Sequence, residues 1–184
     1  MTTTQRDLQQ QLVSDYGANR SRIASIIRPL DPERLVRRPS PHDWSVAEAL
    51  EHLVLTDELF LRSVEPLLRS ARPDAGAPAR SWSPTFVGRN IAGALERPRK
   101  LKSARRARPI KTRGGIAEAF LAIDARYTQL LSEVGTLDWN SVRFRPPVMP
   151  WLPLKMNLGD AFHIRRVHVK RHLGQIERII ASTA

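Results

Sequence analysis

The sequence predicts an all-α protein: a four-helix bundle with a long crossover between the second and third helices. Three observations lead to this prediction. Four segments carry apolar residues at helical spacing, loops rich in proline separate them, and no segment alternates apolar and polar residues as a strand would. The chain of 184 residues is long enough to bury a core, so residues 1–184 are predicted to form one domain.

The first two predicted helices lie in the N-terminal part of the chain. One spans about residues 4–28 and ends before two closely spaced prolines. The other begins at a strong start signal, because Ser45 is a good N-cap and Glu48 follows three residues later as its capping-box partner. Its apolar series continues to about Ser70, which is typical of a helix buried in a bundle.

The crossover and the last two helices follow. Residues 72–115 are rich in proline, glycine, serine and arginine, with one short helical stretch predicted around 86–95. A third long helix is predicted over 115–134. Closely spaced prolines within 144–153 forbid helix and predict a rigid, extended connection. The fourth helix is predicted over 157–180, with an acidic residue favourably placed in its first turn.

The chain is strongly basic, with 30 Lys and Arg against 18 Asp and Glu and a formal net charge of +12. The densest segment, residues 97–113, holds nine basic residues and no acidic one, so it would attract phosphates, anionic lipids or acidic ligands. A solvated loop or an anion-binding loop explains this segment best. A nucleic-acid interface is the least favoured alternative, because the segment lacks aromatic residues for base stacking and any recognition-helix pattern.

Several function classes are excluded by composition. The chain has no cysteine, which rules out disulfide scaffolds, thiolate zinc sites, iron–sulfur clusters and cysteine nucleophiles. The first seven residues contain no apolar signal region, and no apolar run approaches the roughly 20 residues of a membrane span. We therefore expect a cytoplasmic protein that does not span a membrane.

Two histidines four residues apart, His168 and His172, are the most informative chemical feature. On a helix these side chains share one face, with Cβ atoms roughly 5–6 Å apart, and two imidazoles at that distance can bind one metal ion. The zinc-peptidase motif has the same spacing but carries a glutamate after its first histidine. That position is a valine here, which argues against metalloprotease chemistry.

His52 is the candidate for a third ligand, because it lies within the apolar pattern of the second predicted helix. A lone histidine in such a position is most often a core residue with one hydrogen bond. Bundle cores, however, build metal sites from facing helices, and three imidazoles with an open position form a catalytic type of ligand set. His163, about 140° around the helix from His168, is a reserve ligand, and His42 is expected to be a turn or solvent residue.

Three stretches together resemble the DinB-like (DinB/YfiT) superfamily of metal-binding bundles. They are the tryptophan–serine helix start with its histidine (Trp44–His52), the HxxxHxxQ pattern of residues 168–175, and the segment 101–109 that follows a long loop. The resemblance spans nearly the whole chain. It implies a left-handed four-helix bundle and a homodimer.

The resemblance also implies a divalent metal, zinc or nickel, held by His52, His168 and His172. Some members of the superfamily are thiol S-transferases or isomerases that use mycothiol, bacillithiol or glutathione, and many others have no established activity. The sequence therefore predicts a metal-binding bundle that acts as a metal-dependent S-transferase on a small electrophile. A non-catalytic metal-binding stress or binding protein stays open as the alternative.

Two further hypotheses concern residues around this site. Because the chain has no cysteine, the nucleophilic sulfur of an S-transferase would come from a low-molecular-weight thiol cosubstrate, whose carboxylates the arginine-rich crossover could bind. Glu48, one turn before His52, either orients an imidazole or serves only in the capping box, and the capping role is favoured.

Overall fold

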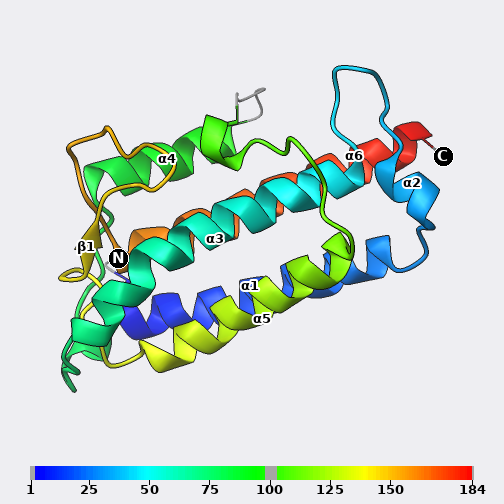
Figure 1. Cartoon of the computed structure of the whole chain (residues 1–184). Helices are drawn as coiled ribbons and strands as arrows, with labels where there is room; N and C mark the ends of the chain where they lie inside the picture. Colours follow the sequence, from blue (N-terminus) through cyan, green and yellow to red (C-terminus); the bar gives the residue numbers. More distant parts are fainter. Residues whose placement is uncertain (1–2, 98–102, 184) are drawn as a thin grey trace.

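A computed structural model describes residues 3–97 and 103–183 of the chain (Figure 1). The four predicted long helices form the bundle and match the predicted ranges closely: α1 (Gln5–Ile27), α3 (Val46–Ser70), α5 (Ile116–Glu133) and α6 (Leu158–Thr183). Helix α6 packs against α1 and α3, and α5 packs against the same two helices. The all-α bundle and its long crossover between α3 and α5 are therefore confirmed. Within the described residues, no helix is both long and apolar enough to span a membrane.

The bundle helices begin where the chain offers side-chain caps. Ser45 Oγ accepts a hydrogen bond from the Glu48 amide at 3.2 Å, and Glu48 Oε2 accepts one from the Ser45 amide at 2.9 Å. Thr4 and Asp7 form the same reciprocal capping box at the start of α1. These contacts satisfy amides that would otherwise lack partners, so they fix the residue at which each helix starts.

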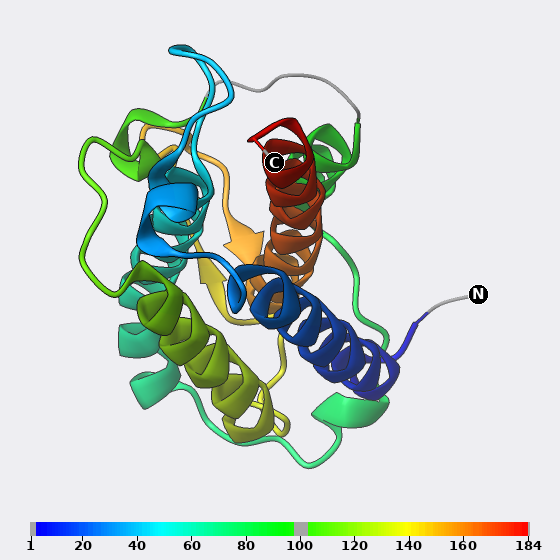
Figure 2. The ribbon, with the colours of Figure 1, turned by 90° about the vertical axis from the view of Figure 1, so that its right-hand side faces the viewer.

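The crossover carries the predicted short helix, α4 (Phe86–Glu96), which packs on the outside of α6 (Figure 2). Its start is tied to the start of α6, because Thr85 Oγ1 donates a hydrogen bond of 2.6 Å to Asp160 Oδ2. Gly88 faces the same carboxyl group so closely that a Cβ there would lie 2.1 Å from Asp160 Cγ. Only glycine permits this approach of α4 to α6.

Five short elements of the described residues were not predicted: one helix, two strands and the single-turn 3-10 helices η1 (Ala77–Ala79) and η2 (Arg105–Ala107). A short helix, α2 (Pro32–Val36), begins at a proline that was predicted only to end the preceding helix. Proline also favours the first position of a helix, and Asp31 caps this one. In addition, β1 (Arg143–Phe144) pairs antiparallel with β2 (Met156–Asn157), although no strand was expected. The extended, proline-rich chain between them doubles back, and two-residue strands are too short to show alternation.

The buried apolar residues form two clusters, one toward each end of the bundle. On α3, the residues up to Val54 belong to one cluster and those from Phe60 onward to the other. Buried polar side chains occupy the level between them, among them Asp57 on α3 and Arg165 on α6. The three candidate histidines lie beside this level.

Candidate metal centre

The three histidines predicted as ligands meet inside the bundle. His52 on α3 and His168 and His172 on α6 are 6–7% exposed. The Nε2 atom of His168 lies 3.0 Å from His52 Nε2 and 3.1 Å from His172 Nε2. One ring nitrogen from each residue lies within 4.8 Å of the other two, so the group could hold a metal ion.

The local sequence explains why the rings converge. The capping box sets the start of α3 at Val46, six residues before His52, and apolar neighbours turn that face of the helix toward α6. On α6, the four-residue spacing places His168 and His172 one above the other. Because α3 and α6 pack against each other, the three side chains point into the same space.

Hydrogen bonds to the other ring nitrogens fix the protonation of two rings. His52 Nδ1 lies 2.6 Å from the carbonyl oxygen of Ala107, and His172 Nδ1 lies 2.7 Å from Gln175 Oε1. Both partners are acceptors, so each Nδ1 carries the hydrogen and donates it. The Nε2 atoms of His52 and His172 therefore carry lone pairs, and both lone pairs face His168.

The electrostatics keep the three rings neutral. Burial lowers the pKa of His52 and His168 below the ordinary value, and it lowers the pKa of His172 to about 3. The neighbouring imidazoles and the Arg171 guanidinium lower the pKa values of His168 and His172 further. Neutral imidazole is the form that binds metal ions.

The donor set fits a divalent metal ion. Nitrogens bonded at about 2.0 Å to one tetrahedral zinc ion lie about 3.3 Å from each other, close to the two separations of the Nε2 atoms here. Three neutral imidazoles suit zinc, nickel, copper or iron alike. A hydrogen on His168 Nε2 could be donated to only one of the two facing lone pairs at a time, whereas a cation at the common point would be bound by all three nitrogens.

Trp44 and the crossover surround the rings. The Trp44 ring centroid lies 5.1 Å from that of His52 and 6.1 Å from that of His172, nearly parallel to the latter. Ser103 Oγ lies 3.3 Å from His52 Nδ1. The residues 101–102 at the start of the segment quoted for the family resemblance lie outside the described residues.

The remaining candidates do not join the cluster. His163 Nδ1 accepts a hydrogen bond from Arg166 Nη2 at 3.1 Å, and its ring packs on Trp82, so it is no reserve ligand of this group. His42 is exposed in a turn, as predicted. The Glu48 carboxylate is engaged by the Ser45 amide and by Arg38, which gives it the capping role.

Sequence reasoning missed two groups that orient the rings. The Ala107 carbonyl belongs to the backbone, so no residue type could have signalled its role. Gln175 lay in the quoted HxxxHxxQ pattern, and its position three residues after His172 on the same helix face was the signal for the contact.

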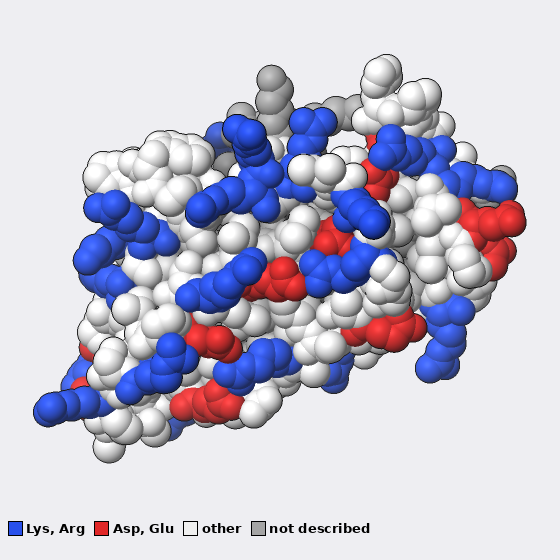
Figure 3. Space-filling model, in the orientation of Figure 1, with Lys and Arg blue, Asp and Glu red and all other residues white. Residues whose placement is uncertain are grey.

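The basic residues do not form one continuous patch on the face shown in Figure 3, where acidic side chains are interspersed with them. Within the predicted basic segment, Arg105, Arg106 and Arg108 are described and exposed, on either side of the buried Ala107. The predicted basic residues Arg99, Lys100 and Lys102 lie outside the described residues.

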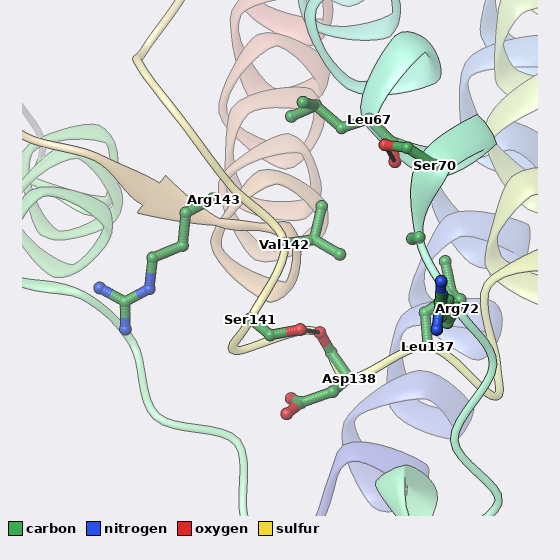
Figure 4. A pocket seen from close by; sticks show the side chains of 9 residues that line it. Leu67, Ser70, Arg72, Leu137, Asp138, Ser141, Val142 and Arg143 are labelled. Atoms are coloured by element: carbon green, nitrogen blue, oxygen red, sulfur yellow. Dashed lines mark hydrogen bonds between the residues drawn. The ribbon is translucent and has the colours of Figure 1, made fainter.

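A cavity of about 280 Å³ lies at the far end of α3 (Figure 4). Its lining includes Leu67 of α3 and Asp138 and Arg143 of the chain after α5. Fifteen residues of helix, about 22 Å, separate Leu67 from His52, so this cavity is not part of the histidine site.

The fold and the buried histidines define a helical bundle with a candidate metal site, and comparisons with known proteins identify its family. A family model described as the DinB superfamily matches residues 16–176, and the chain belongs to that superfamily. Among solved structures, YfiT from Bacillus subtilis, described as a probable metal-dependent hydrolase with an unusual four-helix bundle topology, is similar to this chain. The match has a TM-score of 0.58 at 13% identity and covers 93% of this chain and 85% of YfiT, so it shows the fold. No curated protein sequence matched.

Proposed function

We propose that the chain binds one divalent metal ion, zinc or nickel, through His52, His168 and His172. We further propose that it transfers the sulfur of a low-molecular-weight thiol to a small electrophile. The observation that carries the proposal is the convergence of three buried imidazole nitrogens, two of which have their lone pairs set by hydrogen bonds from Nδ1.

The chain's own residues supply orientation and shielding. A bound ion of the zinc class would act as a Lewis acid and lower the pKa of a coordinated thiol or water. The Ala107 carbonyl and Gln175 hold two rings in one tautomer, which fixes the direction of their lone pairs. Trp44 stacks on the face of His172 and lies against His52, which limits access of water from that side.

The acidic residues beside His52 favour a thiol over water as the nucleophile. Attack by water usually needs a general base, and Glu48 and Glu51 are the nearest acids along α3. Glu48 is bound by Arg38, and Glu51 is bound by Arg113. A thiol that loses its proton on coordination needs no such base.

The cosubstrate we propose is anionic. Arg105, Arg106 and Arg108 are exposed on the turn whose Ala107 carbonyl contacts His52, so their guanidinium groups can bind carboxylates of a thiol near the cluster. In the reaction, a sulfur–carbon bond forms, the thiol proton passes to solvent, and the leaving group departs from the electrophile with its bonding electrons.

Elemental analysis of protein purified without a metal-binding tag tests the metal part of the proposal. We expect about one equivalent of zinc or nickel in the wild type and in His163→Ala, and its loss in His52→Ala and His168→Ala.

A screen of thiols with a generic electrophile tests the reaction. Turnover that needs both the metal and one particular thiol supports S-transfer; turnover without a thiol supports hydrolysis, and metal binding without turnover supports a non-catalytic protein.

The expected homodimer and cytoplasmic location stay predictions. Light scattering on the eluting peak of a size-exclusion column tests the first, and fractionation of cells tests the second. Salt-sensitive binding to DNA or RNA in a protein without stoichiometric metal would instead support the nucleic-acid alternative.

A further inference from the structure

The arginine-rich part of the crossover is attached to α3 at two places. At the first, the Ala107 carbonyl accepts the hydrogen of His52 Nδ1. At the second, six residues later, Arg113 binds Glu51, the residue directly before His52. Figure 1 shows this part of the chain running along α3 before it enters α5.

The second attachment is the more elaborate one. Arg113 donates from its backbone amide to Glu51 Oε2 at 3.0 Å and from Nε and Nη2 to Oε1 at 3.0 and 2.8 Å. Its remaining nitrogen, Nη1, donates to Glu58 Oε1 at 2.8 Å. Glu51 and Glu58 are two helical turns apart, so the guanidinium spans one face of α3.

Burial makes this ion pair different from an ordinary surface pair. Glu51 is 3% exposed, and a buried carboxylate needs hydrogen-bond donors in fixed positions. The donors come from a single residue of the crossover. Because both its backbone and its side chain participate, Arg113 fixes where the crossover lies along α3.

The turn that carries the Ala107 carbonyl meets α3 at His52, whose Nδ1 lies 2.6 Å from the Ala107 oxygen and 3.3 Å from Ser103 Oγ. Its backbone hydrogen bonds, from Ala107 to Ala104 and from Arg108 to Arg105, are internal to the turn. They hold its shape and leave its position over α3 to other contacts. Arg113 is the nearest described residue of the crossover with an ion pair to α3.

We propose that Arg113 and Glu51 are positioning residues for the histidine cluster: their ion pair holds the crossover on α3 so that the Ala107 carbonyl orients His52. The part of the inference that concerns metal affinity rests on the proposed function. The part that concerns the placement of the crossover does not.

The test compares two arginine variants with matched surroundings. Arg126 resembles Arg113: each side chain is 35% exposed and binds two glutamates, but Arg126 binds Glu65 and Glu133, away from the cluster. We compare Arg113→Met with Arg126→Met, and include Glu51→Gln/Arg113→Met, which leaves no unpaired buried charge. The two measurements are amide hydrogen exchange over residues 103–113 in metal-free protein and the dissociation constant for Zn²⁺ by chelator competition.

We expect faster exchange at the Ala107 amide, and Zn²⁺ binding weakened about 10-fold, in Arg113→Met and in the double variant. Arg126→Met should change neither by more than about 2-fold. Equal effects of the Arg113 and Arg126 variants on both measurements would overturn the inference. If the wild type binds no Zn²⁺ while exchange still separates the two variants, the proposed function fails and the placement of the crossover by Arg113 stands.

Discussion

Two groups of buried polar side chains lie about one helical turn apart in the same bundle, and their hydrogen bonds are arranged differently. In the first, Arg165 donates to Asp57 Oδ2 at 2.9 Å and to Asp124 Oδ1 at 2.8 Å. Its guanidinium also lies 4.6 and 4.3 Å from the ring centroids of Tyr16 and Tyr127. All four bundle helices contribute to this arginine layer, and its donors and acceptors mostly pair within it.

The histidine cluster pairs differently, because the Nε2 atoms of His52 and His172 both lie within hydrogen-bond distance of His168 Nε2, which can carry only one hydrogen. Its three rings are as buried as the arginine layer, but two of the Nε2 atoms are acceptors that face a third nitrogen. Buried polar atoms cost free energy unless they find partners. The comparison shows that burial alone does not mark a functional site. The convergence of three ring nitrogens on one point is what distinguishes the histidine cluster from the arginine layer.

Replacing Arg165 should give the largest effect. Arg165→Met leaves two buried carboxylates without their cation, and breaking a buried pair in this way costs about 3–5 kcal/mol of the free energy of unfolding. Urea unfolding followed by circular dichroism measures it. Arg166→Met is the control, because Arg166 binds the partly exposed Asp15, and we expect a loss of about 1 kcal/mol or less. Similar losses in the free energy of unfolding in both variants would show that the buried ion pairs of Arg165 do not stabilise the core more than a surface ion pair does.

Replacing a histidine should affect metal binding and leave the fold in place. We expect His168→Ala to weaken Zn²⁺ binding by more than about 100-fold, because it removes the ring whose Nε2 lies close to the Nε2 atoms of both other ligands. The metal-free variant should still unfold cooperatively, at a somewhat lower urea concentration than the wild type, because it loses the buried His168 ring and its contacts to the other two. His163→Ala serves as the control on the same helix, because His163 contacts Arg166 and does not join the cluster, and this variant should retain full Zn²⁺ affinity.

In metal-free protein, the contributions of the two groups to the free energy of unfolding should change in opposite directions as the pH rises. Burial places the pKa of His172 at about 3, below its ordinary 6.5, so its contribution to stability is present above pH 6.5 and is lost as the pH falls toward 3. Burial raises the pKa of Asp57 from 3.8 to about 6, so its contribution is present below pH 3.8 and is lost as the pH rises through 6.

Urea unfolding between pH 4 and 8 separates the two contributions. Relative to the wild type, His172→Gln should lose less stability on acidification. Asp57→Asn should lose less stability as the pH rises from about 4 to 6. Parallel pH profiles in the wild type and both variants would contradict the assignment of opposite signs.

The smallest effect should come from Gln175, which acts on the metal only through His172. Gln175→Leu removes the acceptor for His172 Nδ1 and should weaken Zn²⁺ binding about 10-fold, with Gln175→Glu restoring it. Gln129→Leu is the control, because Gln129 makes an exposed contact to Glu133 four residues away. An unchanged dissociation constant in Gln175→Leu would show that the contact does not orient the ring.

The sequence predicted the long helices well because their signals are local. Ser45 and Glu48 mark the start of α3 within four residues, and prolines mark the ends of neighbouring segments. The pairing of β1 with β2 escaped prediction because it depends on contacts across the proline-rich connection. The helical start at Pro32 was missed because proline signals both the end of one helix and the beginning of the next.

The sequence predicted the side chains of the site but not the backbone and long-range contacts that orient them. The four-residue spacing of His168 and His172 and the apolar setting of His52 were sufficient to select the three rings. The Ala107 carbonyl and the attachment by Arg113 join segments more than fifty residues apart through backbone atoms or one ion pair. Such contacts leave no periodic pattern, so they become visible only in the folded chain.

X-ray absorption spectroscopy of the Zn²⁺-loaded, tag-free protein tests the central claim most directly. We predict about three imidazole groups in the scattering around each zinc ion, and loss of this signal in His168→Ala. A zinc environment with one imidazole or none, or one unchanged in His168→Ala, would contradict the assignment of His52, His168 and His172 as the metal ligands.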